Sequence, residues 1–507
     1  MLVFNMGTVM KNFKNCLAFL LIAFLQVACT KDFAKYNLNP DGVTTAQPAY
    51  MLSDALVKTS AVDVETRTNY CHAFMQYGYS DFWSGTTYSL SDGVSSRYWN
   101  NFYIPVLQNL EYIVPILKNK TDMPTTYAAA RIWRVFIYQK LTDMYGDIPY
   151  SQAGKALSAG VFTPIYDKQQ AIYTDLVKEL RASIELLNNN PSVIVQGDQF
   201  YGGSAAQWKK LASSLLLRIG MRLIKVDPVQ ASALVKEAYS DGVMVSNMDM
   251  PVLKHNTSVA NGFSFSLGDQ HFFLHQTLID QMRKSGDPRL NIYGAVYDKE
   301  AFLGGVVTST DTAKFIGYSF KANSPAPNTR VNYVVYQPKD AVFFDFQYAE
   351  VEFLLAEAIL RGYITGNAND HYQAGVTAHM QSFTLLPTAP TISNAQISAY
   401  LAKNPLVNPA NPTTEGSIER INTEFWIAGF IFDADEVYAN WRRTGYPKLT
   451  PNPNTITGPS SSHGVIPRKL PYPDAEFTLN NTNVTQALTA YGGLNDFNPK
   501  ARVWWDK

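Results

Sequence analysis

The spacing of hydrophobic positions along this chain predicts a succession of long helices. Residues 131–150, RIWRVFIYQKLTDMYGDIPY, form the most regular stretch, because apolar and aromatic residues recur every three to four positions on more than one side. A helix that is apolar on most sides lies between neighbouring elements rather than at the surface. Gly146 is expected to end this helix in the left-handed conformation, and Pro149 prevents it from restarting.

Further helices are predicted by the same spacing on both sides of this stretch. They cover residues 48–62, 64–79, 102–118, 125–145, 168–188, 205–225, 228 to about 242, 276–285, 344–361, 370–383 and 417–444. Two neighbouring helices per unit of roughly 35 to 45 residues resemble the tetratricopeptide arrangement. Stacked pairs of this kind bury a continuous core and leave one concave face. We therefore predict a mainly α fold in which tetratricopeptide-like helix pairs form a superhelical scaffold.

Three stretches interrupt the helical pattern, at about residues 80–101, 249–340 and 447–507. Gly, Ser, Asn and Pro are frequent in them, and fragments such as residues 331–336 alternate enough to predict a short strand or two. Long loop-rich stretches in a compact domain are usually functional. We expect ligand specificity to lie in these insertions.

The first 28 residues have the pattern of a targeting segment. Lys11 and Lys14 precede an apolar run at 17–25 that is too short to span a bilayer. The run ends in Gln-Val-Ala-Cys, which resembles a lipoprotein cleavage site with Cys29 as the lipidated residue. A plain secretory signal cut near Ala28 is the alternative. The predicted organisation is a signal peptide at 1–28, a lipidated tether at 29–45 and a single domain at 46–507.

Composition narrows the possible partners. The chain has 42 basic and 42 acidic residues, so its formal net charge is zero and we expect no nucleic-acid binding. Aromatic residues make up 13%, and Tyr and Trp combine an apolar body with a polar tip that suits a binding surface. Of three cysteines, only Cys71 stays free of the signal and the lipid, so no intrachain disulfide is expected.

Several blocks together resemble the SusD/RagB-like outer-membrane lipoproteins. They are YGDIPY at 145–150, DPR at 287–289, YAEVEFLLAEAILRG at 348–362, YQAGVTAHM at 372–380, NWRRTGYP at 440–447, IPRKLPYP at 466–473 and VWWD at 503–506. The resemblance implies a glycan-binding lipoprotein at the cell surface that captures oligosaccharides and delivers them to a SusC-like TonB-dependent barrel. It also implies that the protein is not an enzyme. Some relatives take peptides, so a peptide ligand is the alternative.

Ring-bearing residues in the insertions are the predicted ligand contacts. Flat aromatic faces pack on the apolar faces of sugar rings, while planar polar groups bind the hydroxyls. The candidates are Trp83 and Tyr88 from the first insertion and Asn261, Phe263, Phe265 and His271 from the second. We expect Trp83 and Tyr88 to be exposed.

Other chemistry is less well supported by the sequence. Glu350, Glu352 and Glu357 share one helix, and a glycan hydrolase would use two of them as acid and base. We instead expect them to pair with arginines such as Arg218 or Arg222 between packed helices. A lipoprotein that only braces the transporter, without binding ligand, is a further alternative.

No metal site or cofactor is predicted. His271 and His275 are one helical turn apart, but the glutamate of a zinc-hydrolase HExxH motif is missing between them. A structural Ca²⁺ in an Asp/Asn-rich loop is left open by the sequence.

Overall fold

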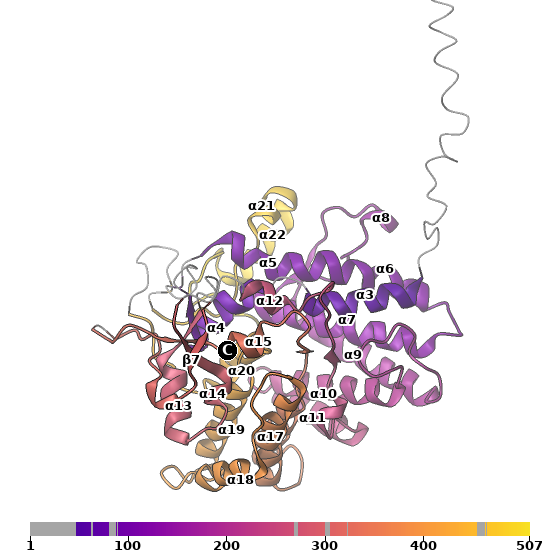
Figure 1. Ribbon diagram of the computed structural model, residues 1–507. Coiled ribbons are helices and arrows are strands. Elements are labelled where there is room, and N and C mark those ends of the chain that lie inside the picture. The colour runs from indigo at the N-terminus through magenta and orange to yellow at the C-terminus, as the bar shows by residue number, and fades with distance from the viewer. Residues whose placement is uncertain are drawn as a thin grey trace, which may run out of the picture. The chain divides into compact units, whose positions relative to one another are not determined.

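Packed helices account for most of the chain. The computed structural model describes residues 47–61, 64–80, 88, 90–267, 272–299, 305–321, 323–453, 462 and 464–507, and residues 48–507 form one compact unit. The first group of helices is α3 (Pro48–Ala61), α5 (Asp92–Phe102), α6 (Gln108–Leu117), α7 (Pro124–Tyr145), α9 (Gln169–Asn189), α10 (Ala205–Arg222) and α11 (Pro228–Asp241). Figure 1 shows α3, α6, α7 and α9 side by side, and α10 packs on both α9 and α11. The predicted mainly α architecture of tetratricopeptide-like pairs is confirmed.

A second group of helices continues this packing. It comprises α16 (Tyr348–Leu360), α17 (Ala368–Ser382), α18 (Asn394–Lys403), α19 (Thr414–Ala428) and α20 (Ala434–Thr444). Helix α16 packs on α17 and α19 and also on α10, so it joins the two groups. All of α16 from Ala349 to Ala358 is buried, as expected for a helix with neighbours on every side.

Short strands lie beside the helices. A five-stranded antiparallel sheet has the order β1 (Gly78–Ser80), β5 (Phe272–Leu274), β8 (Thr329–Val331), β6 (Gly294–Tyr297) and β7 (Val307–Ser309). Two further antiparallel pairs join β2 (Ile148–Pro149) to β3 (Tyr166–Asp167) and β4 (Val252–Leu253) to β9 (Phe343–Phe344). Four of the five sheet strands come from the 249–340 insertion, which is therefore built around a sheet rather than loops alone.

The remaining elements are short. They are η1 (Arg67–Cys71), α4 (His72–Phe74), η3 (Tyr103–Leu107), α8 (Ala156–Ala159), η4 (Asn247–Asp249), α12 (Gly262–Ser266), α13 (Gln276–Ser285), α14 (Leu290–Tyr293), η6 (Thr312–Lys314), α15 (Tyr333–Tyr336), η7 (Phe383–Leu385), α21 (Asp474–Leu479), α22 (Asn481–Leu488) and η8 (Thr489–Tyr491).

The predicted single helix over 417–444 was wrong, because residues 429–433 divide it into α19 and α20. Ile431 has a φ of 69°, which no continuous helix allows. The break lets Phe430 leave the helical path and stack on Tyr293, with ring centroids 4.3 Å apart. Burial of these rings compensates for the lost helical turn.

Three other boundaries differ from the prediction. The helix predicted over 64–79 stops at Phe74, because Gln76 takes a positive φ and the chain then enters β1. The strand predicted at 331–336 ends at Val331 and is followed by the single turn α15. Gly146 does end α7, but with φ 83° and ψ −119° it occupies a glycine-specific region rather than the left-handed helical one.

The C-terminal stretch from residue 447 is part of the core rather than a ligand-binding insertion for most of its length. Leu470, Tyr472 and Trp505 are almost completely buried. The Trp505 indole donates a hydrogen bond to Asp143 of α7 at 2.7 Å. This segment therefore braces the helices, and only its first residues reach the cleft described below.

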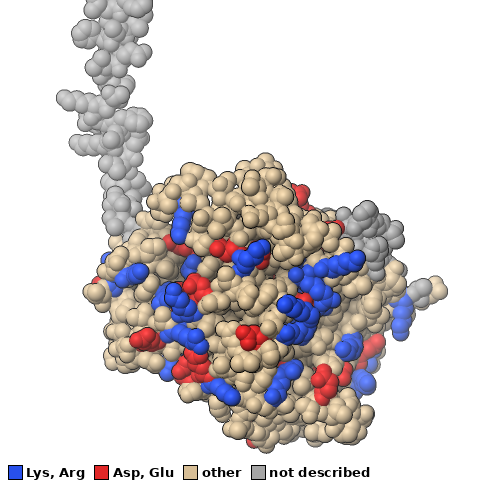
Figure 2. Space-filling view, turned by 180° about the vertical axis from the view of Figure 1, so that it is seen from behind, with Lys and Arg blue, Asp and Glu red and all other residues tan. Residues whose placement is uncertain are grey.

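None of the helices in the described part of the chain has the length and apolar character needed to span a bilayer. Cys71, the one cysteine among the described residues, is buried and free. On the face seen in Figure 2, basic and acidic side chains are interspersed, as the zero net charge leads one to expect.

Candidate functional site: a cleft beside helix α13

Two of the predicted ligand contacts, Trp83 and His271, lie outside the described residues. The described residues that flank them, Ser80 of β1 and Phe272 of β5, are register partners in the sheet. Phe265 lies on α12.

Tyr88 lies within the described residues, and the prediction that its side chain is exposed was wrong. Its side chain is only 2% exposed, and its ring packs edge-on against Phe74 at 5.5 Å. Burial raises the pKa of the Tyr88 hydroxyl above its ordinary value. Phe74 belongs to the core, so Tyr88 anchors the first insertion there.

Asn261 and Phe263 also face inward. The Asn261 amide donates to the carbonyl of Ala341 at 3.1 Å, and its oxygen accepts from the backbone N–H of Phe263 at 2.8 Å. The Phe263 ring is fully buried and lies parallel to that of Phe343, 5.2 Å away. These two side chains fix α12 to the core and present no free face to a ligand.

A cleft of about 650 Å³ runs along α13, and we call it the α13 cleft. One wall is α13 from Gln276 to Lys284, together with the preceding His275. Residues 315–317, 319–321 and 324–325 form the second wall, and residues 447–450 with Trp426 complete the lining. Its size suits an oligosaccharide or a peptide, since ligand sites in proteins are commonly about 300 to 1,000 Å³.

The α13 cleft has an apolar floor. Phe315, Phe320, Trp426 and Leu449 line it, and Phe320 is held edge-on by His275 with centroids 4.7 Å apart. Beside it, the rings of Tyr79 and Tyr318 stack at 3.7 Å and 8°. Phe315 and Trp426 are only 2% and 1% exposed, so the apolar surface open to a sugar ring is limited to part of Phe320, at 8%, and to the partly buried Leu449.

The polar groups of the cleft wall are held in fixed positions. Gln276 donates to Asp280 at 2.7 Å and accepts from the backbone N–H of Gly317 at 2.8 Å. Thr277 donates to Gln76 at 2.9 Å. Side chains held in this way are preorganised, so a ligand pays less to order them on binding.

The His275 ring is buried, and one of its two nitrogen atoms has no hydrogen-bond partner among the described residues. Its Nδ1 accepts a hydrogen bond from the Thr277 N–H at 3.1 Å, so the neutral ring carries its proton on Nε2. Burial lowers the pKa of His275 to about 3, which keeps the ring neutral. No hydrogen-bond partner of Nε2 is found among the described residues.

His271 and His275 are four residues apart in the sequence, but the residues between them do not form a helical turn. Phe272, Phe273 and Leu274, the intervening residues, are strand β5 rather than a helical turn. Among the described residues, no group of three or more His, Cys, Asp or Glu side chains could hold a metal ion.

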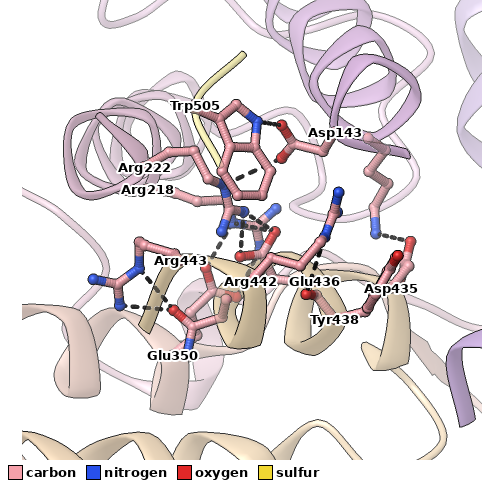
Figure 3. A network of polar contacts seen from close by, with 12 residues as sticks. Asp143, Arg218, Arg222, Glu350, Asp435, Glu436, Tyr438, Arg442, Arg443 and Trp505 are labelled. Atoms are coloured by element: carbon pink, nitrogen blue, oxygen red, sulfur yellow. Dashed lines mark hydrogen bonds and ion pairs between the residues drawn. The ribbon is translucent and has the colours of Figure 1, made fainter. Parts of the chain in front are cut away.

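The three glutamates of α16 are structural, as the sequence suggested. Arg218 binds Glu350 through two hydrogen bonds of 2.6 and 2.7 Å, and Figure 3 shows this pair within a buried charged network. Burial raises the pKa of Glu350 and Arg218 lowers it. The space beside Glu350 measures about 10 Å³, far too small for a sugar.

Glu357 and Glu352 are paired in the same manner. Arg443 binds Glu357 with two bonds of 2.7 Å, and Arg361 adds a third. Despite burial, these arginines lower the pKa of Glu357 to about 2. Glu352 bonds to His371 at 2.7 Å. A pair of carboxylates facing a substrate is therefore not formed on α16.

The sequence matches the SusD-like family described as "Starch-binding associating with outer membrane" over residues 40–473. No curated protein matches. A solved structure of a chitin-binding protein is 31% identical with a TM-score of 0.79, and the match covers 91% of this chain and 100% of that one.

Two further solved structures are similar over nearly their whole length. A SusD-like protein from Bacteroidetes is 27% identical with a TM-score of 0.77, covering 91% of this chain and 100% of that one. A SusD homologue from Bacteroides uniformis is 25% identical with a TM-score of 0.73, covering 90% of this chain and 99% of that one. The family match spans most of the chain and agrees with the helical scaffold. The chain belongs to the SusD-like family.

Proposed function

We propose that this protein is a cell-surface lipoprotein that captures an oligosaccharide in the α13 cleft and delivers it, chemically unchanged, to a TonB-dependent outer-membrane transporter. The observation that supports capture is the α13 cleft itself, in which aromatic floor residues and fixed polar groups lie together. The family description and the chitin-binding relative support a glycan as ligand.

Binding without hydrolysis is the simplest use of this geometry. Among the described residues that line the cleft, Asp280 is the one carboxylate, and a glycosidase needs a pair of carboxyl groups across the scissile bond. The carboxylates of Glu350 and Glu357 are buried in ion pairs away from the cleft. The matching family and the 31% identical relative are described as binding glycans, which also supports binding without hydrolysis.

The anchor and the transporter are parts of the proposal that rest on the sequence. A lysine-led apolar segment ending at Cys29 supports lipidation, and residues 29–45 would tether the folded unit to the membrane. The transporter enters the proposal through the resemblance of the sequence to the SusD/RagB-like lipoproteins. Trp83, Phe265 and His271 remain predicted ligand contacts.

Titration calorimetry with a panel of ligands tests the capture function. The panel contains starch-derived, chitin-derived and acidic oligosaccharides and mixed short peptides. We expect binding of at least one glycan and no reducing ends released by the wild-type protein. Phe320→Ala removes the aromatic floor, and Gln281→Trp fills the cleft from α13, so both should weaken binding about tenfold or more. Phe162→Ala, at an exposed position outside the cleft, is the control.

Each outcome has a defined meaning. Glycan binding that is lost in both cleft variants but kept in the control supports the proposal. Binding of peptides alone moves the ligand to the peptide class, and release of reducing ends makes the protein an enzyme. If no ligand of the panel binds, the result favours a lipoprotein that supports the transporter without binding ligand. All three of these results contradict glycan capture.

A further inference from the structure

A second hollow continues the α13 cleft toward α19. It has a volume of about 340 Å³ and shares Gln281 and Lys284 with the cleft. Its other walls come from the end of α18 and from α19. Because Gln281 and Lys284 line both spaces, the cleft and this hollow adjoin along α13, and we call the two together the trough.

Basic side chains dominate the lining of this trough. Among the described residues that line it there are six cationic side chains and two acidic ones. The cations are Arg283, Lys284, Lys321, Lys403, Arg420 and Lys448, and the acids are Asp280 and Glu419. The chain as a whole is neutral, so the excess is specific to the trough.

The lysines are not committed to internal ion pairs. Among the described residues, no carboxylate lies within 4.0 Å of Lys284, Lys321, Lys403 or Lys448, and all four side chains are exposed. Some cations elsewhere in the protein are paired, for example Lys140 with Asp435 at 2.7 Å. The trough therefore leaves positive charge available for a ligand.

The arginines are held in position by uncharged groups. Arg283 donates to the carbonyls of Thr312 and Phe315 at 2.6 and 2.9 Å, and Asp280 is 4.0 Å away. Arg420 donates to the Asn404 side chain at 3.5 Å. Among the described residues, no carboxylate lies closer to either guanidinium group than Asp280 does to Arg283.

The C-terminus of α13 accounts for only part of this arrangement. A helix end carries about half a negative charge, which favours cations in its last turn. Arg283 and Lys284 lie in that turn, and the Lys403 ammonium lies over Gly286 just beyond it. Lys321, Arg420 and Lys448 come from other segments and face no such dipole.

We propose that the trough selects an anionic glycan, one that carries uronate carboxylates or sulfate esters, with Lys284 and Lys403 among its contacts. This inference rests on the proposed glycan-capture function and names the class of sugar. Cations near the apolar floor match such a chain, in which each ring offers an apolar face beside a charged group. An acidic peptide would offer the charges without the ring faces that Phe320 and Leu449 suit.

The test is calorimetric titration of the full chain at about 50 and 300 mM salt. The ligands are oligogalacturonate, a sulfated chondroitin oligosaccharide, neutral chitin and starch oligosaccharides, and oligoglutamate. We expect an anionic glycan to bind about tenfold or more tightly than the neutral ones, and to weaken as salt increases. Oligogalacturonate carries carboxylates alone, whereas the chondroitin oligosaccharide carries sulfate esters beside its carboxylates, so tighter binding of the second indicates a contribution from sulfate.

Two double variants test whether the trough lysines cause the preference for anionic glycans. Lys284→Gln/Lys403→Gln should weaken anionic-glycan binding about fivefold or more and change neutral-glycan binding less than about twofold. Lys118→Gln/Lys120→Gln removes two lysines outside the trough and is the control. All six cations are solvent-accessible or lie at the surface of the trough, so the variants are expected to fold.

The failures of the two proposals are distinguishable. Tighter binding of neutral glycans, without salt dependence, overturns the anionic inference and leaves glycan capture intact. Oligoglutamate binding as tight as that of the acidic glycans also overturns it, in favour of acidic peptides. No binding of any glycan overturns the capture function itself.

Discussion

Arg218 of α10 and Glu350 of α16 form a two-bond ion pair in the protein interior, with Nε–Oε1 at 2.6 Å and Nη2–Oε2 at 2.7 Å. The pair joins the two groups of helices, and Arg222 continues it toward Glu436 and Asp143 (Figure 3). A buried charge is costly when it loses its partner, so such a pair makes one helix arrangement preferable to others.

Glu350→Gln is expected to destabilise the fold by about 3 to 5 kcal/mol, because it leaves the Arg218 guanidinium buried with incomplete compensation. The double variant Arg218→Met/Glu350→Leu should lose much less, since neither charge remains. Denaturant unfolding measures both. A single variant as stable as the wild type would mean that the pair does not hold α10 against α16.

The sequence predicts the scaffold well, because helix pairing depends on local periodicity. Trp208, Leu211, Leu215 and Ile219 repeat at helical spacing, and α10 forms where they do. The pairing of Arg218 with the α16 glutamates also follows from sequence, since charges on fully apolar helices need partners. The break at Ile431 could not be predicted in this way, because it depends on the distant ring of Tyr293.

The candidate site was much harder to predict. A ring in a Ser- and Gly-rich segment can face solvent or the core, and Tyr88 and Phe263 face the core through contacts with Phe74 and Phe343. The α13 cleft is assembled from segments more than one hundred residues apart. Its signals in the sequence were modest: the polar face of α13 and the spacing of Phe315 and Phe320.

Lys469 gives the protein a specific pH dependence. Its ammonium is buried, donates to the Leu470 carbonyl at 2.8 Å and lies over the rings of Tyr472 and Tyr491. These contacts favour the charged form, but burial outweighs them and lowers the pKa of Lys469 from 10.5 to about 7. Between pH 7 and 10.5 the unfolded chain binds more protons here than the folded one, so stability from this group rises with pH.

Lys469→Met should therefore stabilise the protein most at pH 7 and below. The gain should shrink by about 1.4 kcal/mol for each pH unit above 7. Denaturant unfolding at pH 6.5, 8 and 9.5 measures it, with Lys178→Met at an exposed position as control. A gain that does not change with pH would show that Lys469 stays charged in the folded state.

Gly146 is required by geometry at the end of α7. A Cβ atom there would lie 2.0 Å from the Tyr491 hydroxyl, which accepts a hydrogen bond from the Asp147 N–H at 2.8 Å. Gly146→Ala should cost about 2 kcal/mol or more through backbone strain and loss of this bond. Gly160→Ala, at φ 68° with open space around it, should cost about 1 kcal/mol. Equal losses in thermal unfolding would remove the role of Tyr491.

Cys29 is predicted to attach the protein to the membrane. Full-length protein expressed with its own signal should incorporate radiolabelled palmitate and sediment with membranes. Cys29→Ser should do neither, because the proposed lipid is attached through the Cys29 sulfur. Detergent extraction of the wild type should recover a barrel transporter with it. Membrane association that survives Cys29→Ser would contradict the lipid anchor.

A co-crystal structure with the tightest-binding oligosaccharide of the panel tests the central claim most directly. We predict an intact sugar chain in the α13 cleft, with a ring packed on Phe320 and its polar groups within hydrogen-bond distance of α13. An oligosaccharide bound outside the cleft, or one cleaved in the crystal, would contradict the account.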